Sequence, residues 1–154
     1  MKTDYVFPVQ VTDKGAELGY ASDKLAMLLL TPFVKVAWAE GFVQASEQKA
    51  ILRFAENFGV KPGHADYEKL LGWFDERPAE EFFACAIEDL RRLLDRIPPK
   101  QAARLRAMLQ FGCIEVANAS GDIGLLRGGS NIRREEREQL KFIGERLGLM
   151  HSYV

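Results

Sequence analysis

The sequence predicts an all-α protein, a bundle of about six to eight helices, and three observations support this fold class. Apolar side chains recur at helical spacing along most of the chain. No segment alternates apolar and polar residues over the length of a strand, and one helix–turn–helix unit occurs twice. A chain of 154 residues is long enough to bury its own core, and we expect one domain over residues 22–150.

The first predicted helix is the most apolar part of the chain. Residues 1–21 before it are expected to form an irregular leader, because Pro8 lacks an amide donor and disfavours a central strand. The segment from Asp23 to Glu40 is apolar on most sides, which is typical of the buried centre of a bundle. Pro32 lies inside this segment, and we expect it to kink the helix or divide it in two.

Glycine and proline residues separate the helices that follow. Glycine adopts the left-handed backbone conformation that ends a helix, and proline removes a helical hydrogen bond. Residues 122–130 are rich in glycine and are expected to form a loop, and residues 151–154 a tail. The remaining predicted helices cover about residues 45–58, 67–74, 83–97, 105–116 and 134–147.

A helix–turn–helix unit is repeated in residues 25–60 and 105–149. Val-Ala-Trp-Ala-Glu-Gly at 36–41 matches Val-Ala-Asn-Ala-Ser-Gly at 116–121. In both copies, a helix therefore ends in small residues and glycine, and small side chains allow helices to approach closely. The second helix of each unit also ends at a glycine. The loop 122–130 is an insertion in the second copy.

Each unit places a glutamate where its second helix begins. These residues are Glu47 in the first unit and Glu136 in the second. A carboxylate in the first turn of a helix is favoured by the positive end of the helix dipole and can cap a free amide. Two copies of one unit predict a bundle with an internal pseudo-twofold repeat.

This pattern resembles the tellurite-resistance TerB-like family. The family's signature is a pair of helical units with a small-residue helix end, Asp-Gly, a turn, and Glu at the next helix start. The resemblance implies a helical bundle that serves tellurite resistance or stress responses as an interaction or scaffold module, without enzymatic activity. Some members of that family also have an acidic surface with metal-binding potential. Glu40 and Ser120 stand where the family has Asp, which weakens the case for a site of paired aspartates.

Acidic side chains around the two turns are the candidate metal ligands. Calcium takes about six to eight oxygen ligands, so these carboxylates would need backbone carbonyls and water to complete a site. Capping and solvated acids are the alternative interpretation. If calcium or magnesium binds weakly, we expect the first turn, at Glu40-Gly41, to hold it. The four candidates are Glu40, Glu47, Asp122 and Glu136.

Bulky aromatic residues are more numerous than one helix face needs. Phe82 and Phe83 are adjacent, so one of them should face away from the local core. Trp73 and Phe82 are the candidates for binding a partner, with core packing as the alternative. The partner would be another protein, and a homodimer is a further possibility.

Composition excludes several other partners. A net charge of −1 gives no general attraction to nucleic acid. The longest apolar run, Leu25 to Leu30, is too short to span a membrane, and the N-terminus lacks the features of a signal peptide. Cys85 and Cys113 lie among apolar residues, so we expect buried, reduced thiols and a cytoplasmic location.

The spacing of reactive residues indicates no catalytic group, and we expect a non-enzymatic protein. The alternative is a small-ligand-binding or hydrolytic enzyme that uses the carboxylates at the inter-helix turns. A deep polar pocket with converging carboxylates would favour the enzyme, whereas scattered exposed acids would favour the interaction module.

Overall fold

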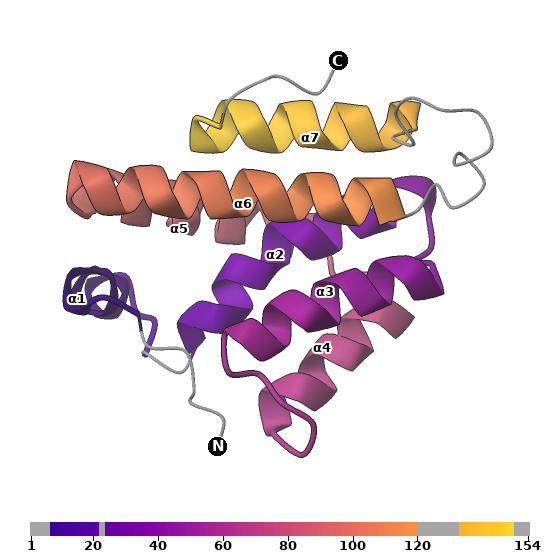
Figure 1. Cartoon of the computed structure of the whole chain (residues 1–154), viewed down its shortest axis with the longest axis horizontal. Helices are drawn as coiled ribbons and strands as arrows, with labels where there is room; N and C mark the ends of the chain where they lie inside the picture. Colours follow the sequence, from indigo (N-terminus) through magenta and orange to yellow (C-terminus); the bar gives the residue numbers. More distant parts are fainter. Residues whose placement is uncertain (1–6, 22–23, 120–132, 150–154) are drawn as a thin grey trace.

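The computed structural model describes residues 7–21, 24–119 and 133–149, and within them it contains helices and no strand (Figure 1). The all-α prediction is confirmed. Asp122, the loop 122–130 and the tail 151–154 lie outside the described residues. The helices are α1 (Val9–Glu17), α2 (Leu25–Ala37), α3 (Ala45–Asn57), α4 (Ala65–Asp75), α5 (Glu80–Arg96), α6 (Pro99–Ala119) and α7 (Arg134–Leu147), with a short 3₁₀ turn η2 (Trp38–Glu40) after α2.

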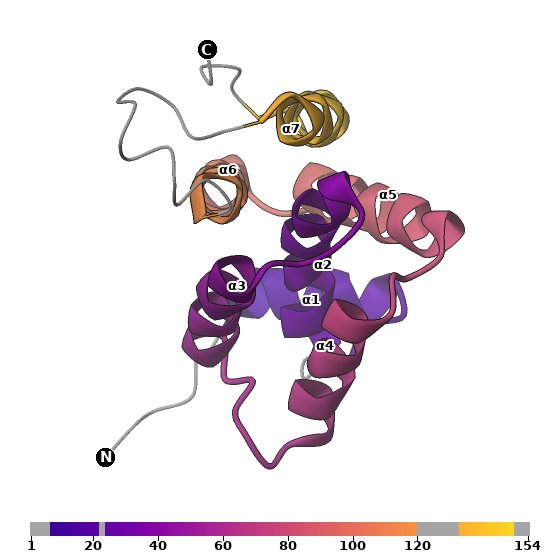
Figure 2. The ribbon, with the colours of Figure 1, turned by 90° about the vertical axis from the view of Figure 1, so that its right-hand side faces the viewer.

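Helix α2 lies at the centre of the bundle. It contacts α3, α4, α5, α6 and α7, and Figure 2 shows these helices arranged around it. In the second unit, α7 returns alongside α6 in the opposite direction (Figure 1). The two repeated units thus contribute α2 and α3 on one side, α6 and α7 on the other, while α4 and α5 connect them.

The central position of α2 explains how it tolerates a proline. Every residue from Leu25 to Ala37 is buried, and the helix continues through Pro32, so the expected division into two helices does not occur. A proline inside a helix costs about 3 kcal/mol, and burial of large apolar side chains at about 1.5–3 kcal/mol each outweighs that cost. Despite this apolar character, none of the helices in the described ranges is long and apolar enough to cross a membrane.

The expectation of an irregular leader is wrong, because residues 9–17 form α1. Pro8 sits at the N-cap, where a missing amide costs nothing, so the residue that disfavours a strand permits a helix start. Val11 and Gly15 are the buried positions of α1. A Cβ atom on Gly15 would lie 2.6 Å from a methyl carbon of Leu25, which shows how closely α1 packs against the start of α2.

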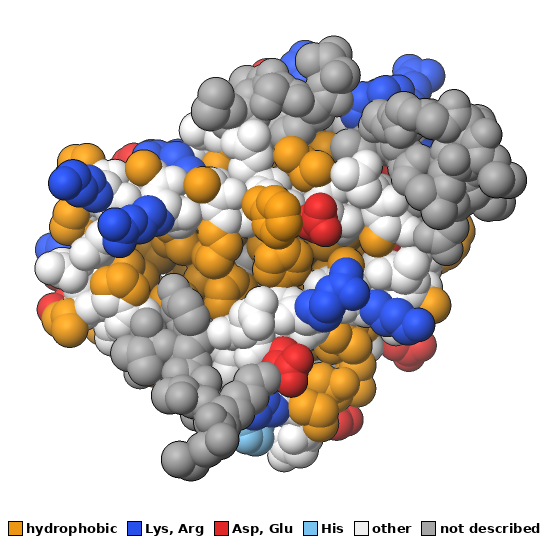
Figure 3. All heavy atoms as spheres, viewed as in Figure 1, with side chains coloured by type: hydrophobic (Ala, Val, Ile, Leu, Met, Phe, Trp, Pro, Cys, Tyr) orange, Lys and Arg blue, Asp and Glu red, His pale blue; other side chains and the backbone are white. Residues whose placement is uncertain are grey.

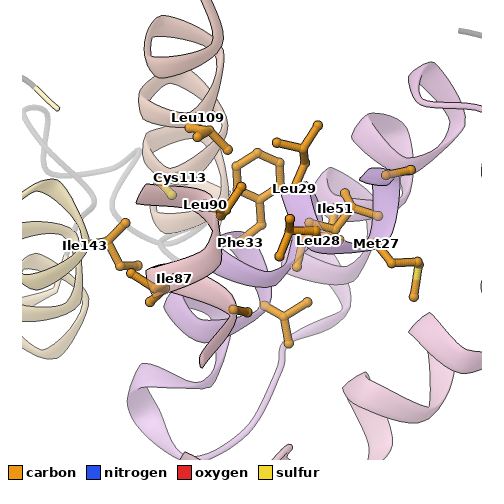
Figure 4. Close-up of a cluster of buried hydrophobic side chains, with 14 of the residues drawn as sticks. Met27, Leu28, Leu29, Phe33, Ile51, Ile87, Leu90, Leu109, Cys113 and Ile143 are labelled. Atoms are coloured by element: carbon orange, nitrogen blue, oxygen red, sulfur yellow. The ribbon is translucent and has the colours of Figure 1, made fainter. Parts of the chain in front are cut away.

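The core joins side chains from most of the helices. Figure 4 shows Phe33 of α2, Leu90 of α5 and Leu109 of α6 gathered in one cluster, and each is fully buried. Gly112 allows α6 to approach α2, because a Cβ atom there would lie 2.3 Å from the ring of Phe33. This contact fixes the spacing between the two units.

The two cysteines differ in their surroundings. Cys113 is buried in the core, as expected, but Cys85 is exposed, so the expectation of two buried thiols is wrong for Cys85. The buried positions of α5 around it are Phe83, Ala86 and Ile87, and Cys85 falls on the opposite face of that helix.

Candidate functional site

Glu47 and Glu136 cap the second helices of the two units in the same way. The backbone N–H of Gln44 donates to Oε1 of Glu47 at 2.8 Å, and the backbone N–H of Arg133 donates to Oε1 of Glu136 at 3.0 Å. Both are capping boxes, in which the third helical residue reaches back to the N-cap. The expected helix capping is therefore confirmed for this pair, but the two side chains are only 1% and 0% exposed, so they are not solvated acids.

The two glutamates also meet each other, and we call them the carboxyl pair. Oε2 of Glu47 is buried and accepts no hydrogen bond from an N–H group. The pKa of Glu47 is raised from 4.5 to about 8. Burial is the largest cause, the hydrogen bond to Glu136 and the charges of Glu136 and Glu40 act in the same direction, and the hydrogen bond from the Gln44 amide lowers the pKa. At neutral pH, Glu47 therefore holds a proton that it can donate to Glu136.

Contacts on either side of the carboxyl pair connect the two units. The hydroxyl of Ser46, at the start of α3, donates to the carbonyl oxygen of Ala119, at the end of α6, over 2.7 Å. The guanidinium of Arg133, before α7, lies 3.1 Å from the carboxylate of Glu40, at the end of η2. The start of the second helix in each unit therefore contacts the end of the first helix in the other unit, and this arrangement occurs in both directions.

Three of the four predicted metal ligands lie close to one another, and the fourth is outside the described residues. Glu40, Glu47 and Glu136 gather at this junction, whereas Asp122 is not described. The two turns therefore form one junction, at which both units place a carboxylate. Within the described ranges, no group of three or more His, Cys, Asp or Glu side chains could hold a metal ion. The carboxylates converge, as the enzyme alternative requires, but the converging pair is buried.

Trp73 and Phe82, the predicted partner-binding residues, lie side by side. Their ring centroids are 5.3 Å apart. Phe82 is 38% exposed while Phe83 is 1% exposed, which confirms that one of the adjacent phenylalanines faces away from the core. The indole N–H of Trp38 donates to the backbone oxygen of Trp73 at 2.8 Å and so anchors the end of α4 against η2.

These two aromatic side chains help to line an open cavity of about 270 Å³, which we call the Trp73 pocket. Its walls come from α2, α4, α5 and the segment after α1. Lys24 and Asp66 form an ion pair of 3.0 Å beside it. The other lining residues are Gly19, Tyr20, Met27, Leu28, Thr31, Lys69 and Ala86.

Tyr20 is the part of the pocket that the sequence analysis missed. Its hydroxyl donates to the carboxylate of Asp89 at 2.6 Å, which holds the segment after α1 against α5. Burial raises the pKa of Tyr20, as do the hydrogen bond to Asp89 and the charge of that residue. An irregular leader gave no reason to place Tyr20 there, and its only signal is that it is an aromatic residue in a polar stretch.

A scan against protein-family models, a search of curated proteins and a search of solved structures each find no match to this chain.

Proposed function

We propose that the chain is a non-enzymatic interaction module that binds a segment of another protein in the Trp73 pocket. The pocket itself is the observation that carries the proposal. Trp73 and Phe82 are partly exposed, lie on rigid helices and flank a concave apolar surface. Aromatic side chains in such pockets contribute most of the binding energy at protein interfaces.

The size and charge of the pocket indicate what it binds. Its volume of about 270 Å³ is below the range of roughly 300–1,000 Å³ that small-molecule sites occupy, so it suits one or two apolar side chains of a peptide. Lys24 already forms an ion pair with Asp66, but Lys69 is exposed and forms no ion pair with any described residue. A partner with an apolar anchor beside an acidic residue would satisfy both features.

The resemblance to the TerB-like family supports a scaffold role in tellurite resistance or stress response. It rests on the repeated unit, with its small-residue helix ends and its glutamates at equivalent helix starts. Under this proposal the protein acts in the cytoplasm, where free thiols such as Cys85 stay reduced.

Selection from a random peptide library displayed on phage tests the proposal directly. We expect enrichment of peptides with an apolar anchor and a nearby acidic residue. Trp73→Ala should weaken their binding at least about tenfold. Ala86→Leu should do the same by filling the pocket, without removing an aromatic side chain.

Phe42→Ala is the matched control for these variants. Phe42 is 56% exposed but does not line the pocket, so its removal should leave peptide affinity unchanged. Failure to enrich any peptide, or equal binding to wild type and Ala86→Leu, would contradict the proposal.

The carboxyl pair favours a second, separate function, which is weak binding of calcium or magnesium. Two buried carboxyls that share a proton can exchange it for a divalent cation, with Glu40 close by. Further ligands would have to come from backbone carbonyls or water. Because metal and proton compete, affinity should rise with pH.

Thermal unfolding in millimolar calcium or magnesium tests ion binding. We expect the metal to raise the Tm more at about pH 9 than at about pH 6, and Glu47→Gln to abolish the increase. Glu135→Gln removes an exposed carboxylate from the same turn of α7 as Glu136 and should respond like wild type. A Tm that does not change with either metal at high pH would end this second proposal.

A further inference from the structure

One face of α6 carries an ordered stripe of side chains that the rest of the described chain covers only in part. Arg104, Met108, Phe111 and Glu115 are spaced four, three and four residues apart, which places them on a single stripe of an α-helix. Phe111 is 58% exposed, the largest exposed fraction among the described aromatic residues, although its ring also meets Phe54 of α3 edge-on, with the ring centroids 6.1 Å apart. Arg104 is exposed, and Met108 and Glu115 are partly exposed.

The charges along this stripe are ordered from basic to acidic. In Figure 3, seen from the same side as Figure 1, blue side chains lie over the left-hand part of α6, orange ones over its middle and a red one just beyond them. Arg104 and Glu115 form no ion pair with any described residue. Arg106, by contrast, donates to the carbonyl oxygen of Leu147 at 2.9 Å and is occupied within the fold.

The order of these side chains makes the stripe complementary to itself. A twofold axis between Leu109 and Gln110 would run two α6 helices antiparallel. The pairs 104/115 and 108/111 are both centred on that point of the sequence. We propose that a second copy of this chain covers the stripe, with Arg104 against the partner's Glu115 and Met108 against the partner's Phe111.

A hollow beside the stripe supports the same arrangement. A cavity of about 240 Å³ lies between α1 and α6, lined by Phe7, Pro8, Val11, Gln101, Arg104, Leu105 and Met108. Because Met108 lies opposite the partner's Phe111, the partner's ring would be placed at the mouth of this cavity. Each copy therefore offers one exposed ring and one apolar hollow, as an isologous contact requires.

We expect the contact to support a reversible dimer. Helix α6 has 21 residues, and at about 1.5 Å per residue it is about 30 Å long. We expect a contact made by one pair of helices to bury an area near the lower end of the range of roughly 1,200–2,000 Å² that is typical of stable interfaces. Dissociation should therefore be visible on dilution. The dimer leaves the Trp73 pocket open, since α6 does not line it.

Sedimentation velocity over a dilution series tests the proposal with a charge-swap pair. Arg104→Glu places two acidic residues opposite each other, and Glu115→Arg places two basic ones. Each change occurs twice in a symmetric dimer, so we expect the dissociation constant to rise about tenfold or more for each variant. The double variant restores opposite charges and should return the constant to near the wild-type value.

Lys141→Glu on α7 is the control, because Lys141 is exposed and lies off the stripe, so this charge reversal should leave association unchanged. Circular dichroism would verify that every variant is folded. A wild type that stays monomeric at the highest concentration reached would overturn the proposal. So would a dimer that neither single reversal weakens, or a double variant that stays monomeric when fully folded.

Discussion

Replacing Glu47 by Gln should make the stability of this protein less sensitive to pH. Glu47 holds a proton well above its ordinary range because it is buried against Glu136. Gln is neutral at every pH and has the same shape. It can accept the hydrogen bond from the Gln44 amide through its oxygen and donate to Glu136 through its nitrogen.

The size of the effect follows from proton linkage. The pKa of Glu47 is about 8 in the folded protein and close to 4.5 when the chain is unfolded. Between these values the folded state binds more protons, so the free energy of unfolding falls as the pH rises. Keeping the carboxyl protonated costs about 1.4 kcal/mol for each pH unit above 4.5, which gives less than about 1 kcal/mol at pH 5 and about 3 kcal/mol at pH 7.

Urea unfolding of wild type and Glu47→Gln at about pH 5 and about pH 7 measures this difference. We expect Glu47→Gln to gain about 2–3 kcal/mol relative to wild type over that interval, because only the wild type contributes this slope. Glu135→Gln, which removes an exposed carboxylate, should follow the wild-type curve. If the free-energy difference between Glu47→Gln and wild type were the same at both pH values, the shared proton would be refuted.

Three other experiments test the packing: a substitution at Gly112, two substitutions at Lys35, and chemical modification of the cysteines. Gly112→Ala should cost about 2–4 kcal/mol in the free energy of unfolding by urea titration, because the new methyl group would overlap the ring of Phe33 unless α6 moves away from α2. Lys35 is 6% exposed, and its ammonium lies 5.3 Å from the centroids of two phenylalanine rings. Lys35→Ala should therefore cost about 2 kcal/mol in the same assay, while Lys35→Met, which keeps the apolar stem, should change stability by less than about 1 kcal/mol. A thiol reagent should modify Cys85 in the native protein and Cys113 only after unfolding, because Cys113 is buried and burial raises its thiol pKa; rapid loss of both thiols would contradict the packing.

The repeat predicted the roles of Glu47 and Glu136 at their helix starts, but it did not predict that they meet. Local spacing places a carboxylate in the first turn of a helix, and capping follows from that position alone. The contact between them depends on how the two units pack, which the spacing does not contain. The equivalent positions of Glu47 and Glu136 in the repeat were the usable signal, because the predicted pseudo-twofold arrangement would bring equivalent residues near its axis together.

Helix α1 was missed for a related physical reason. It buries only Val11 and Gly15, so its sequence has no apolar stripe to reveal a helical period. Its place depends on a close contact with Leu25 and on Tyr20, which reaches Asp89 of α5. One of the two adjacent phenylalanines could be predicted to face outward, because only one of them can point into the core. The Trp73 pocket beside Phe82 could not be predicted, because its walls come from three helices and the segment after α1.

The most direct test of the proposed function follows the two tryptophan indoles by NMR. The chain contains Trp38 and Trp73, so an ¹H–¹⁵N spectrum should show two indole signals. The indole of Trp38 is engaged inside the fold with the backbone of Trp73, whereas the ring of Trp73 lines the pocket. On titration with a selected peptide, the Trp73 signal should shift in a saturable manner and the Trp38 signal should move much less. Binding that leaves the Trp73 indole unchanged would contradict the assignment of the pocket as the docking site.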